Sequence, residues 1–86
     1  MSVEQLLLVA REFSQTYRVR ISDFAALTAA AAASTATIEG ISVHGSRVAA
    51  AESLETVLRA VPALSGKNEE FARLCAKVYL SVAEVM

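Results

Sequence analysis

The sequence predicts an all-α domain of four main helices with one short extended segment. Apolar residues recur at three- and four-residue intervals along four stretches, as on one face of a helix. Serine, aspartate or asparagine precedes each stretch, where a helix cap is expected. Between the second and third stretches, β-branched residues alternate with polar ones, which favours a β-hairpin. At 86 residues we expect a single domain, 1–86.

The first two helices are predicted from their caps. Ser2 and Gln5 have the spacing of a capping box, which predicts a helix over residues 3–17. One face of this helix carries Leu6, Val9 or Ala10, Phe13 and Tyr17. Ser22 with Asp23 offers the next N-cap, and residues 24–33 are strong helix formers with little bulk. Such a helix suits close packing against a neighbour.

Residues 34–46 are predicted to form the extended segment, a short hairpin or flap with Glu39 and Gly40 at its turn, which we call the flap. We expect its edge to pair with a peptide strand of a partner, because main-chain hydrogen bonds supply affinity in that mode of recognition. The residues expected to dock the target are Thr37, Ile38, Glu39, Gly40, Ile41, Ser42 and Val43.

The last two helices flank a short loop. Ser46 is expected to cap a helix over residues 47–60, and Pro62 ends it. Its apolar stripe is Val48, Ala51, Leu54, Val57 or Leu58, and Val61. Asn68 is expected to cap a fourth helix that runs to the end of the chain. The apolar face of that helix is Phe71, Leu74, Cys75, Val78 and Val82.

Composition excludes several classes of function. The formal net charge is −1, so nothing points to direct nucleic-acid or anionic-membrane binding. The longest apolar run, residues 24–33, is roughly half a bilayer span, and the N-terminus lacks a basic start. We therefore expect a soluble, cytoplasmic protein. With one cysteine and one histidine, no metal site can be drawn from soft ligands. Cys75 is expected to be a buried helix residue, and His44 is assigned no role.

Residues 61–80, "VPALSGKNEEFARLCAKVYL", resemble the active-site motif of the Fic/Doc family. The likeness is closer to its death-on-curing branch, the toxin halves of bacterial toxin–antitoxin pairs. The family motif is His-Pro-Phe-x-Asp/Glu-Gly-Asn-x-Arg, followed by an alanine-rich helix. Pro62, Gly66 and Asn68 match it, whereas Val61 stands for the histidine, Ala63 for the phenylalanine, Ser65 for the acid and Glu70 for the arginine, with Lys67 inserted after Gly66. "ISDFAALTAAAA" and "ATIEGISVHGS" resemble the family's preceding helix and flap, so the likeness covers about residues 20–82.

The resemblance implies an enzyme site that has degenerated. Family members transfer AMP or phosphate from a nucleotide to a protein hydroxyl, with the histidine as base and the arginine on the phosphates. Val61 can accept no proton. Glu70 places negative charge where phosphate would bind, and Ser65 alone is a poor magnesium ligand. We expect no catalytic residue, no metal and no cofactor, with ATP and magnesium relevant only if the family activity survives.

The resulting hypothesis is a toxin-like component that binds a protein, for example an antitoxin, through the flap groove. Because the family core continues with further helices, we expect a truncated or minimal member that completes its core as a homodimer. Two alternatives stay open. One is a helical interaction module unrelated to Fic, which uses the apolar faces of its first and fourth helices. The other is an active transferase with a site rebuilt around His44 or Ser65.

Overall fold

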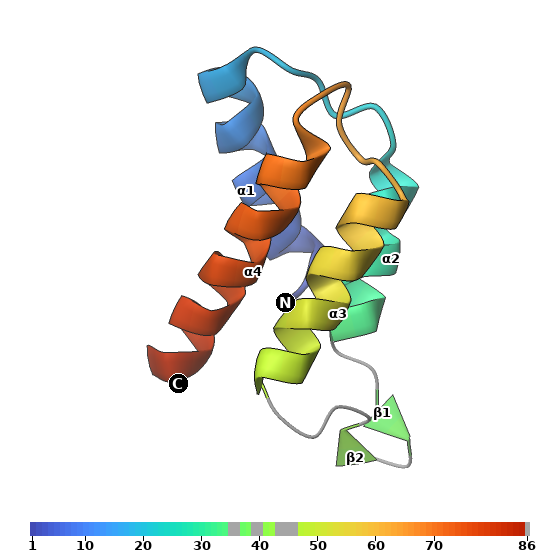
Figure 1. The fold of residues 1–86 in the computed structure, drawn as a ribbon, viewed down its shortest axis with the longest axis vertical. Coiled ribbons are helices and arrows are strands. Elements are labelled where there is room, and N and C mark those ends of the chain that lie inside the picture. The colour runs from blue at the N-terminus through green and yellow to red at the C-terminus, as the bar shows by residue number, and fades with distance from the viewer. Residues whose placement is uncertain (35–36, 39–40, 43–46, 86) are drawn as a thin grey trace.

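Four helices make up most of the chain. The computed structural model describes residues 1–34, 37–38, 41–42 and 47–85. Within them lie α1 (Val3–Tyr17), α2 (Phe24–Ser34), α3 (Arg47–Ala60) and α4 (Asn68–Val85). The helices run alternately up and down, so that the α1–α2 and α3–α4 loops meet at one end of the molecule (Figure 1). The all-α prediction is confirmed, and each helix boundary lies within a residue of its predicted position.

The predicted cap of α1 is present. The backbone N–H of Gln5 donates to Ser2 Oγ over 3.2 Å, and the backbone N–H of Ser2 donates to Gln5 Oε1 over 2.9 Å. These two bonds satisfy amides that the first turn of a helix leaves unpaired. The helix ends where Arg18 adopts a left-handed conformation (φ 56°) and its N–H donates to the carbonyl of Ser14. Both ends of α1 are therefore fixed by local hydrogen bonds.

Helix α2 is capped at its start and tied to the N-terminus at its end. Asp23 Oδ1 accepts from the backbone N–H of Ala26 over 3.3 Å, so the cap is Asp23 rather than Ser22. At the other end, Ser34 Oγ accepts from the Met1 ammonium over 3.1 Å and lies 3.0 Å from the carbonyl of Ala31. Burial lowers the pKa of that ammonium. The Met1 side chain is itself buried, which the sequence had not predicted.

One apolar core joins the four helices. Helix α3 packs along both α2 and α4, and α1 closes the side against α2 and α4. Alanines are buried on both α2 and α3, which lets these two helices approach closely. The rings of Phe13 and Phe71 lie 5.4 Å apart and connect α1 to α4. The largest fully buried side chains are Phe71, Leu6, Leu27, Leu54, Leu58 and Cys75.

Four residues of the predicted apolar stripes are exposed, so these predictions were wrong. Tyr17, the last residue of α1, is 49% exposed. Val48 is 56% exposed because it lies about 120° around α3 from Leu54. Val61 is 40% exposed because α3 ends before it, at Ala60. Leu74 is 37% exposed because it lies about 100° around α4 from the buried Cys75. The predicted helical period was correct, but the buried faces of α3 and α4 are centred on other residues than the predicted stripes.

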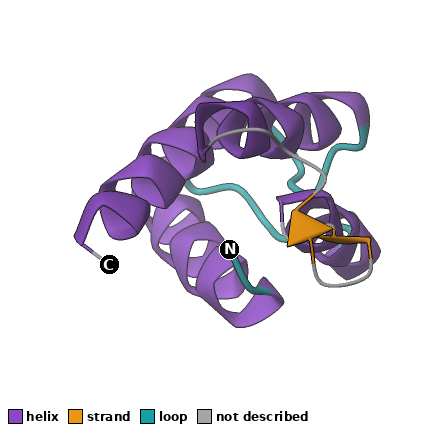
Figure 2. Cartoon of the chain, turned by 90° about the horizontal axis from the view of Figure 1, so that it is seen from below, coloured by secondary structure: helices purple, strands orange, loops and turns teal. Residues whose placement is uncertain are grey.

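The flap is described in part. Strands β1 (Thr37–Ile38) and β2 (Ile41–Ser42) pair antiparallel, with Thr37 opposite Ser42 and Ile38 opposite Ile41. Seen from below, this strand pair lies at the end of the bundle away from the α3–α4 loop (Figure 2). Glu39, Gly40 and Val43 lie outside the described residues, as do His44 and the predicted cap Ser46. The flap as a functional hairpin therefore stays a prediction.

Ser14 gives a test of the packing of α1. Its Oγ is buried and has no hydrogen-bond partner among the described residues. Replacing this serine by alanine removes an unsatisfied polar atom and improves helix propensity. We expect Ser14→Ala to raise the free energy of unfolding by about 0.5–2 kcal/mol in urea. The matched control is Gln15→Ala on the exposed side of α1, which changes propensity alone and should give the smaller gain.

Candidate functional site

The candidate site is the α3–α4 junction, which is bonded to the α1–α2 loop. The backbone N–H groups of Ser22 and Asp23 donate to the carbonyl of Ala63 over 2.8 and 3.1 Å. The N–H of Ser65 donates to the carbonyl of Arg20 over 2.8 Å, and the N–H of Arg20 donates to Ser65 Oγ over 2.9 Å. Ile21 and Leu64 form an antiparallel bridge between these bonds. We call this pairing of residues 20–23 with residues 63–65 the loop tie.

Asn68 closes the outer edge of the loop tie. Its Oδ1 accepts from the backbone N–H of Leu64, and its Nδ2 donates to the carbonyl of Leu64, both over 2.9 Å. The amide thus imitates a neighbouring strand at a part-buried position. The prediction that Asn68 caps α4 was wrong in mechanism, because its side chain bonds backward to the loop. The carbonyl of Lys67 accepts from the N–H of Phe71 over 3.0 Å, which puts Lys67 in the N-cap position.

Lys67 adopts the left-handed conformation at this turn. Its φ is 55°, whereas Gly66 beside it lies outside the left-handed region. A Cβ on Gly66 would meet Val19 Cγ1 at 3.5 Å, an ordinary van der Waals contact. The conformation for which glycine is best suited therefore falls on a lysine. Lys67 Nζ lies 5.4 Å from the centre of the Tyr17 ring, a cation–π contact that contributes to holding this turn.

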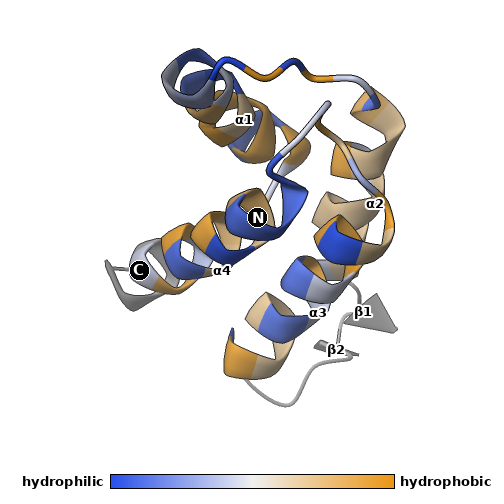
Figure 3. Cartoon of the chain, turned by 45° about the horizontal axis from the view of Figure 1, so that its top comes forward, coloured by the Kyte–Doolittle hydropathy of each residue, from blue (hydrophilic) through white to orange (hydrophobic). Residues whose placement is uncertain are grey.

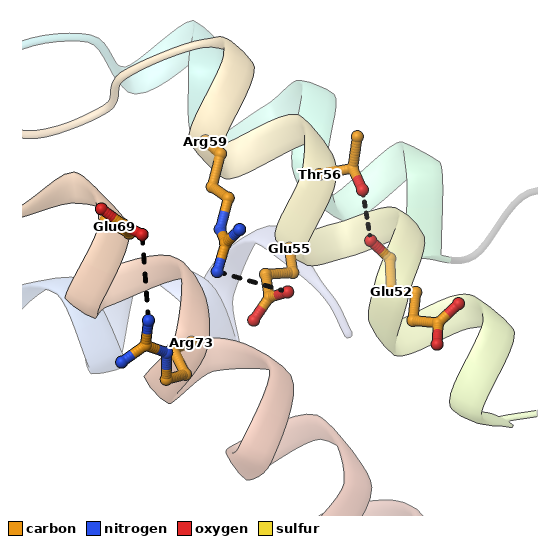
Figure 4. A network of polar contacts seen from close by, with 6 residues as sticks. All are labelled: Glu52, Glu55, Thr56, Arg59, Glu69 and Arg73. Atoms are coloured by element: carbon orange, nitrogen blue, oxygen red, sulfur yellow. Dashed lines mark hydrogen bonds and ion pairs between the residues drawn. The ribbon is translucent and has the colours of Figure 1, made fainter.

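The N-terminus of α4 carries exposed acidic side chains. Glu69 and Glu70 occupy its first turn. Glu69 Oε1 lies 3.8 Å from a guanidinium nitrogen of Arg73, and a second i,i+4 pair, Glu55 with Arg59, has the same separation on α3 (Figure 4). Exposed pairs of this kind contribute little to stability. Their consequence is electrostatic, because Glu69 and Glu70 oppose the binding of a further anion at this helix end.

The motif residues are gathered in one loop but do not form a reaction centre. Val61 and Pro62 are exposed at the end of α3, and neither side chain titrates. Ser65 Oγ is an acceptor in the loop tie. Leu64 is buried, although the sequence had marked the loop as a connection. In the sequence, Leu64 is the one large apolar residue within "PALSGK", and this was the available signal that the loop packs into the core.

The flap strands do not join the motif in one groove. Helix α3 lies between them, and its 14 residues span about 21 Å. The strand pair and the α3–α4 loop lie at opposite ends of the bundle (Figure 1). A target that docks on both would have to reach along the whole of α3.

Other candidate chemistry is limited in the described part of the chain. Burial raises the pKa of the Cys75 thiol from 9.0 to about 12, so its reactive thiolate form is disfavoured. Among the described residues, no group of histidine, cysteine, aspartate and glutamate side chains is placed to hold a metal ion. None of the described helices has both the length and the apolar character needed to cross a membrane.

Comparison of the chain with protein-family models, with curated proteins and with solved structures gave no match. The resemblance to the Fic/Doc family therefore stays a prediction from the motif residues.

Substitution of Asn68 separates the loop-bonding role from a helix cap. Asn68→Ala removes the acceptor of the Leu64 N–H and the donor to the Leu64 carbonyl. We expect it to lower the free energy of unfolding by about 1–3 kcal/mol. Asn68→Asp restores the acceptor but sets a carboxylate oxygen against the Leu64 carbonyl. A helix N-terminus favours a carboxylate by only about 0.3–1 kcal/mol, so we expect a net loss of about 1–3 kcal/mol at pH 7. Urea unfolding measures both.

The pH dependence of Asn68→Asp provides the internal control. The protonated acid has an O–H that can donate to the Leu64 carbonyl, so the folded state raises the pKa of the new group above the usual value of about 3.9. Stability relative to the parent should be regained at low pH and lost as pH rises through that raised pKa. Glu69→Gln, one residue away, should change stability by less than about 0.5 kcal/mol. An Asn68→Asp variant as stable as the parent at pH 7 would restore the cap interpretation.

Cys75 makes stability depend on alkaline pH. The folded state holds the thiol proton more tightly than the unfolded chain does, since the folded pKa is about 12 against 9.0. The contribution of this pKa difference to the free energy of unfolding is therefore fully present below pH 9, and it declines as pH rises from 9 toward 12. Cys75→Ala should show a shallower alkaline decline, measured by urea unfolding. At pH 8 a disulfide reagent should label Cys75 slowly in buffer and quickly in urea, and fast labelling of the folded chain would contradict its burial.

Proposed function

We propose that the chain is a Fic/Doc-like, toxin-type component of a bacterial toxin–antitoxin system that binds a protein and transfers no nucleotide group. The observation that carries this proposal is the structural use of the α3–α4 loop. The Asn68 amide is bonded to Leu64, and Ser65 is bonded to Arg20. Groups that would face a nucleotide in an active member of that family are instead bonded to backbone, Asn68 within its own loop and Ser65 across to the α1–α2 loop.

Electrostatics support the loss of nucleotide binding. A helix N-terminus ordinarily attracts phosphate through its free N–H groups and its positive dipole end. At α4 that end already carries Glu69 and Glu70. A triphosphate would bring several further negative charges beside these two carboxylates. Lys67 is the nearest basic residue along the chain, and its ammonium lies over the Tyr17 ring.

Protein binding is supported by apolar side chains on the surface. Leu8 is 64% exposed on α1, and Phe24, Val48 and Val61 are also exposed. Aromatic and large aliphatic side chains provide the anchors of protein interfaces. We retain as parts of this proposal a protein partner such as an antitoxin, a homodimeric form and a cytoplasmic location. Docking of a peptide strand on the flap is a further part of it.

A helical interaction module without enzyme ancestry is the second candidate. The exposed Leu8 on α1 and Leu74 on α4 favour it, because these are the two helices whose outer faces that hypothesis uses. The neighbouring gene separates the two candidates. Co-expression of this chain with a small adjacent reading frame should give a stoichiometric complex if the toxin–antitoxin proposal holds. The absence of such a reading frame and of a complex would favour the module.

Calorimetry with ATP and magnesium tests the loss of nucleotide chemistry. We expect no saturable heat from the parent chain up to millimolar ATP, because Glu69 and Glu70 both stand where the phosphates would bind and only Glu69 has an arginine partner, Arg73. The matched variant, Glu69→Gln with Glu70→Gln, removes that repulsion without touching the loop tie and should bind more strongly than the parent. Micromolar binding by the parent that disappears in Asn68→Ala would refute the proposal.

A further inference from the structure

Helix α1 has the smallest interfaces of the four described helices. Helix α3 packs extensively against α2 and α4, whereas α1 contacts α2 and α4 alone among the described helices and lies diagonally across the bundle from α3 (Figure 3). The buried side chains of α1 are Leu6, Ala10 and Phe13. We call residues 1–17 the arm, and we call the helices α2, α3 and α4 with the loop tie the body.

The arm and the body are joined by a short hinge. The N–H groups of Arg18 and Val19 both donate to the carbonyl of Ser14, which belongs to the arm. The next N–H along the chain, that of Arg20, donates to Ser65 Oγ in the loop tie. The backbone thus changes its hydrogen-bond partner between Val19 and Arg20. The arm can turn at this point while every hydrogen bond of the loop tie is kept.

The other end of the arm is held by Met1 and Ser34, a pair that we call the latch. The Met1 side chain is buried, and Ser34 Oγ accepts from the Met1 ammonium over 3.1 Å and lies 3.3 Å from the Met1 carbonyl oxygen. Ser34 is the last residue of α2, at the start of the predicted flap. Between the latch and the hinge, the ring of Phe13 packs on that of Phe71 with 5.4 Å between their centres. The latch and this ring contact are what an opening of the arm must break.

The closed position of the arm carries a cost that opening removes. Ser14 Oγ is buried and has no hydrogen-bond partner among the described residues. A hydroxyl buried in this way has lost its hydrogen bonds to water, and it regains them when it is exposed. The closed arm is accordingly held less firmly than its apolar contacts alone would hold it.

We propose that α1 is a hinged arm that opens as one unit from an intact body, turning between Val19 and Arg20 and releasing the latch. Opening removes the Phe13 ring from Phe71 in the core and frees Ser34, the residue at the start of the predicted flap. Elements with few buried apolar contacts open at a lower free energy than the whole chain unfolds. This inference goes beyond the proposed function and does not depend on it.

Native-state hydrogen exchange of the whole chain, followed by NMR at low urea concentrations, tests the arm. A 15-residue helix detached from its core is marginal in water, so its amides exchange while the arm is open. We expect the slowest amides of α1 to share one opening free energy. After correction for intrinsic rates, they should exchange at least about tenfold faster than the slowest amides of α3. The urea dependence of the α1 opening should be shallower than that of global unfolding, because less surface is exposed.

Matched variants separate opening of the arm from unfolding of the body. Asn68→Ala weakens the loop tie, which the open form retains. It should speed exchange of the α3 amides at least about fivefold and change α1 exchange by less than about twofold. Phe13→Leu weakens the closed form alone, so it should speed exchange in both helices by the same factor, about two- to tenfold. Ser34→Ala, which removes the acceptor of the latch, should act in the same way as Phe13→Leu. Circular dichroism verifies that the variants are folded.

Three results would overturn the proposal. A common opening free energy for the α1 and α3 amides of the parent chain would mean that the four helices unfold only together. Amides of α1 that exchange independently of one another would indicate fraying of the helix instead of an opening. A rise of α1 and α3 exchange by the same factor in Asn68→Ala would mean that the loop tie breaks when the arm opens. None of these results bears on the toxin-type proposal, which calorimetry and co-expression test separately.

Discussion

The arrangement of the four helices depends on the loop tie. Backbone groups in a loop must find partners when the loop is drawn against a core, and each one left unpaired costs on the order of 1–3 kcal/mol. Here the two loops satisfy one another, and the Asn68 amide satisfies Leu64 as both acceptor and donor. Because these bonds are made, Leu64 can be buried, and the two helical hairpins, α1–α2 and α3–α4, are fixed at one end.

This use of the loop has a chemical consequence. In a phosphate-binding loop, the backbone N–H groups and polar side chains converge on an empty space that the ligand occupies. At the α3–α4 junction Ser65 instead bonds to the neighbouring loop, and the Asn68 amide bonds to Leu64 of its own loop. Ser65 and Asn68 each have protein partners, and the helix end beyond them is acidic. An asparagine that follows a proline–glycine loop is therefore compatible with a purely structural role.

The sequence predicted local structure better than it predicted roles. Ser2, Asp23 and Pro62 act over a few residues, and the ends of the helices followed from them. The burial of Leu64 and Met1 depends on segments far away in the chain, so periodicity within one helix could not reveal it. Asn68 shows the same limit. An asparagine side chain can either cap a helix or bond to a loop backbone as a neighbouring strand would. Which of the two Asn68 does depends on whether the first turn of α4 or the Leu64 backbone lies within reach of its amide.

The loop tie also bears on the order in which the chain folds. Its hydrogen bonds join residues 40 (Asp23 to Ala63) to 45 (Arg20 to Ser65) positions apart, whereas α3 and α4 are neighbours in sequence and share an extensive interface. Closing a long loop costs conformational entropy before its contacts repay that cost, so distant pairings form late and local ones early. We expect the α3–α4 hairpin to assemble first, with α1 docking last. The loop tie would then be absent from early folding intermediates and complete only late in folding.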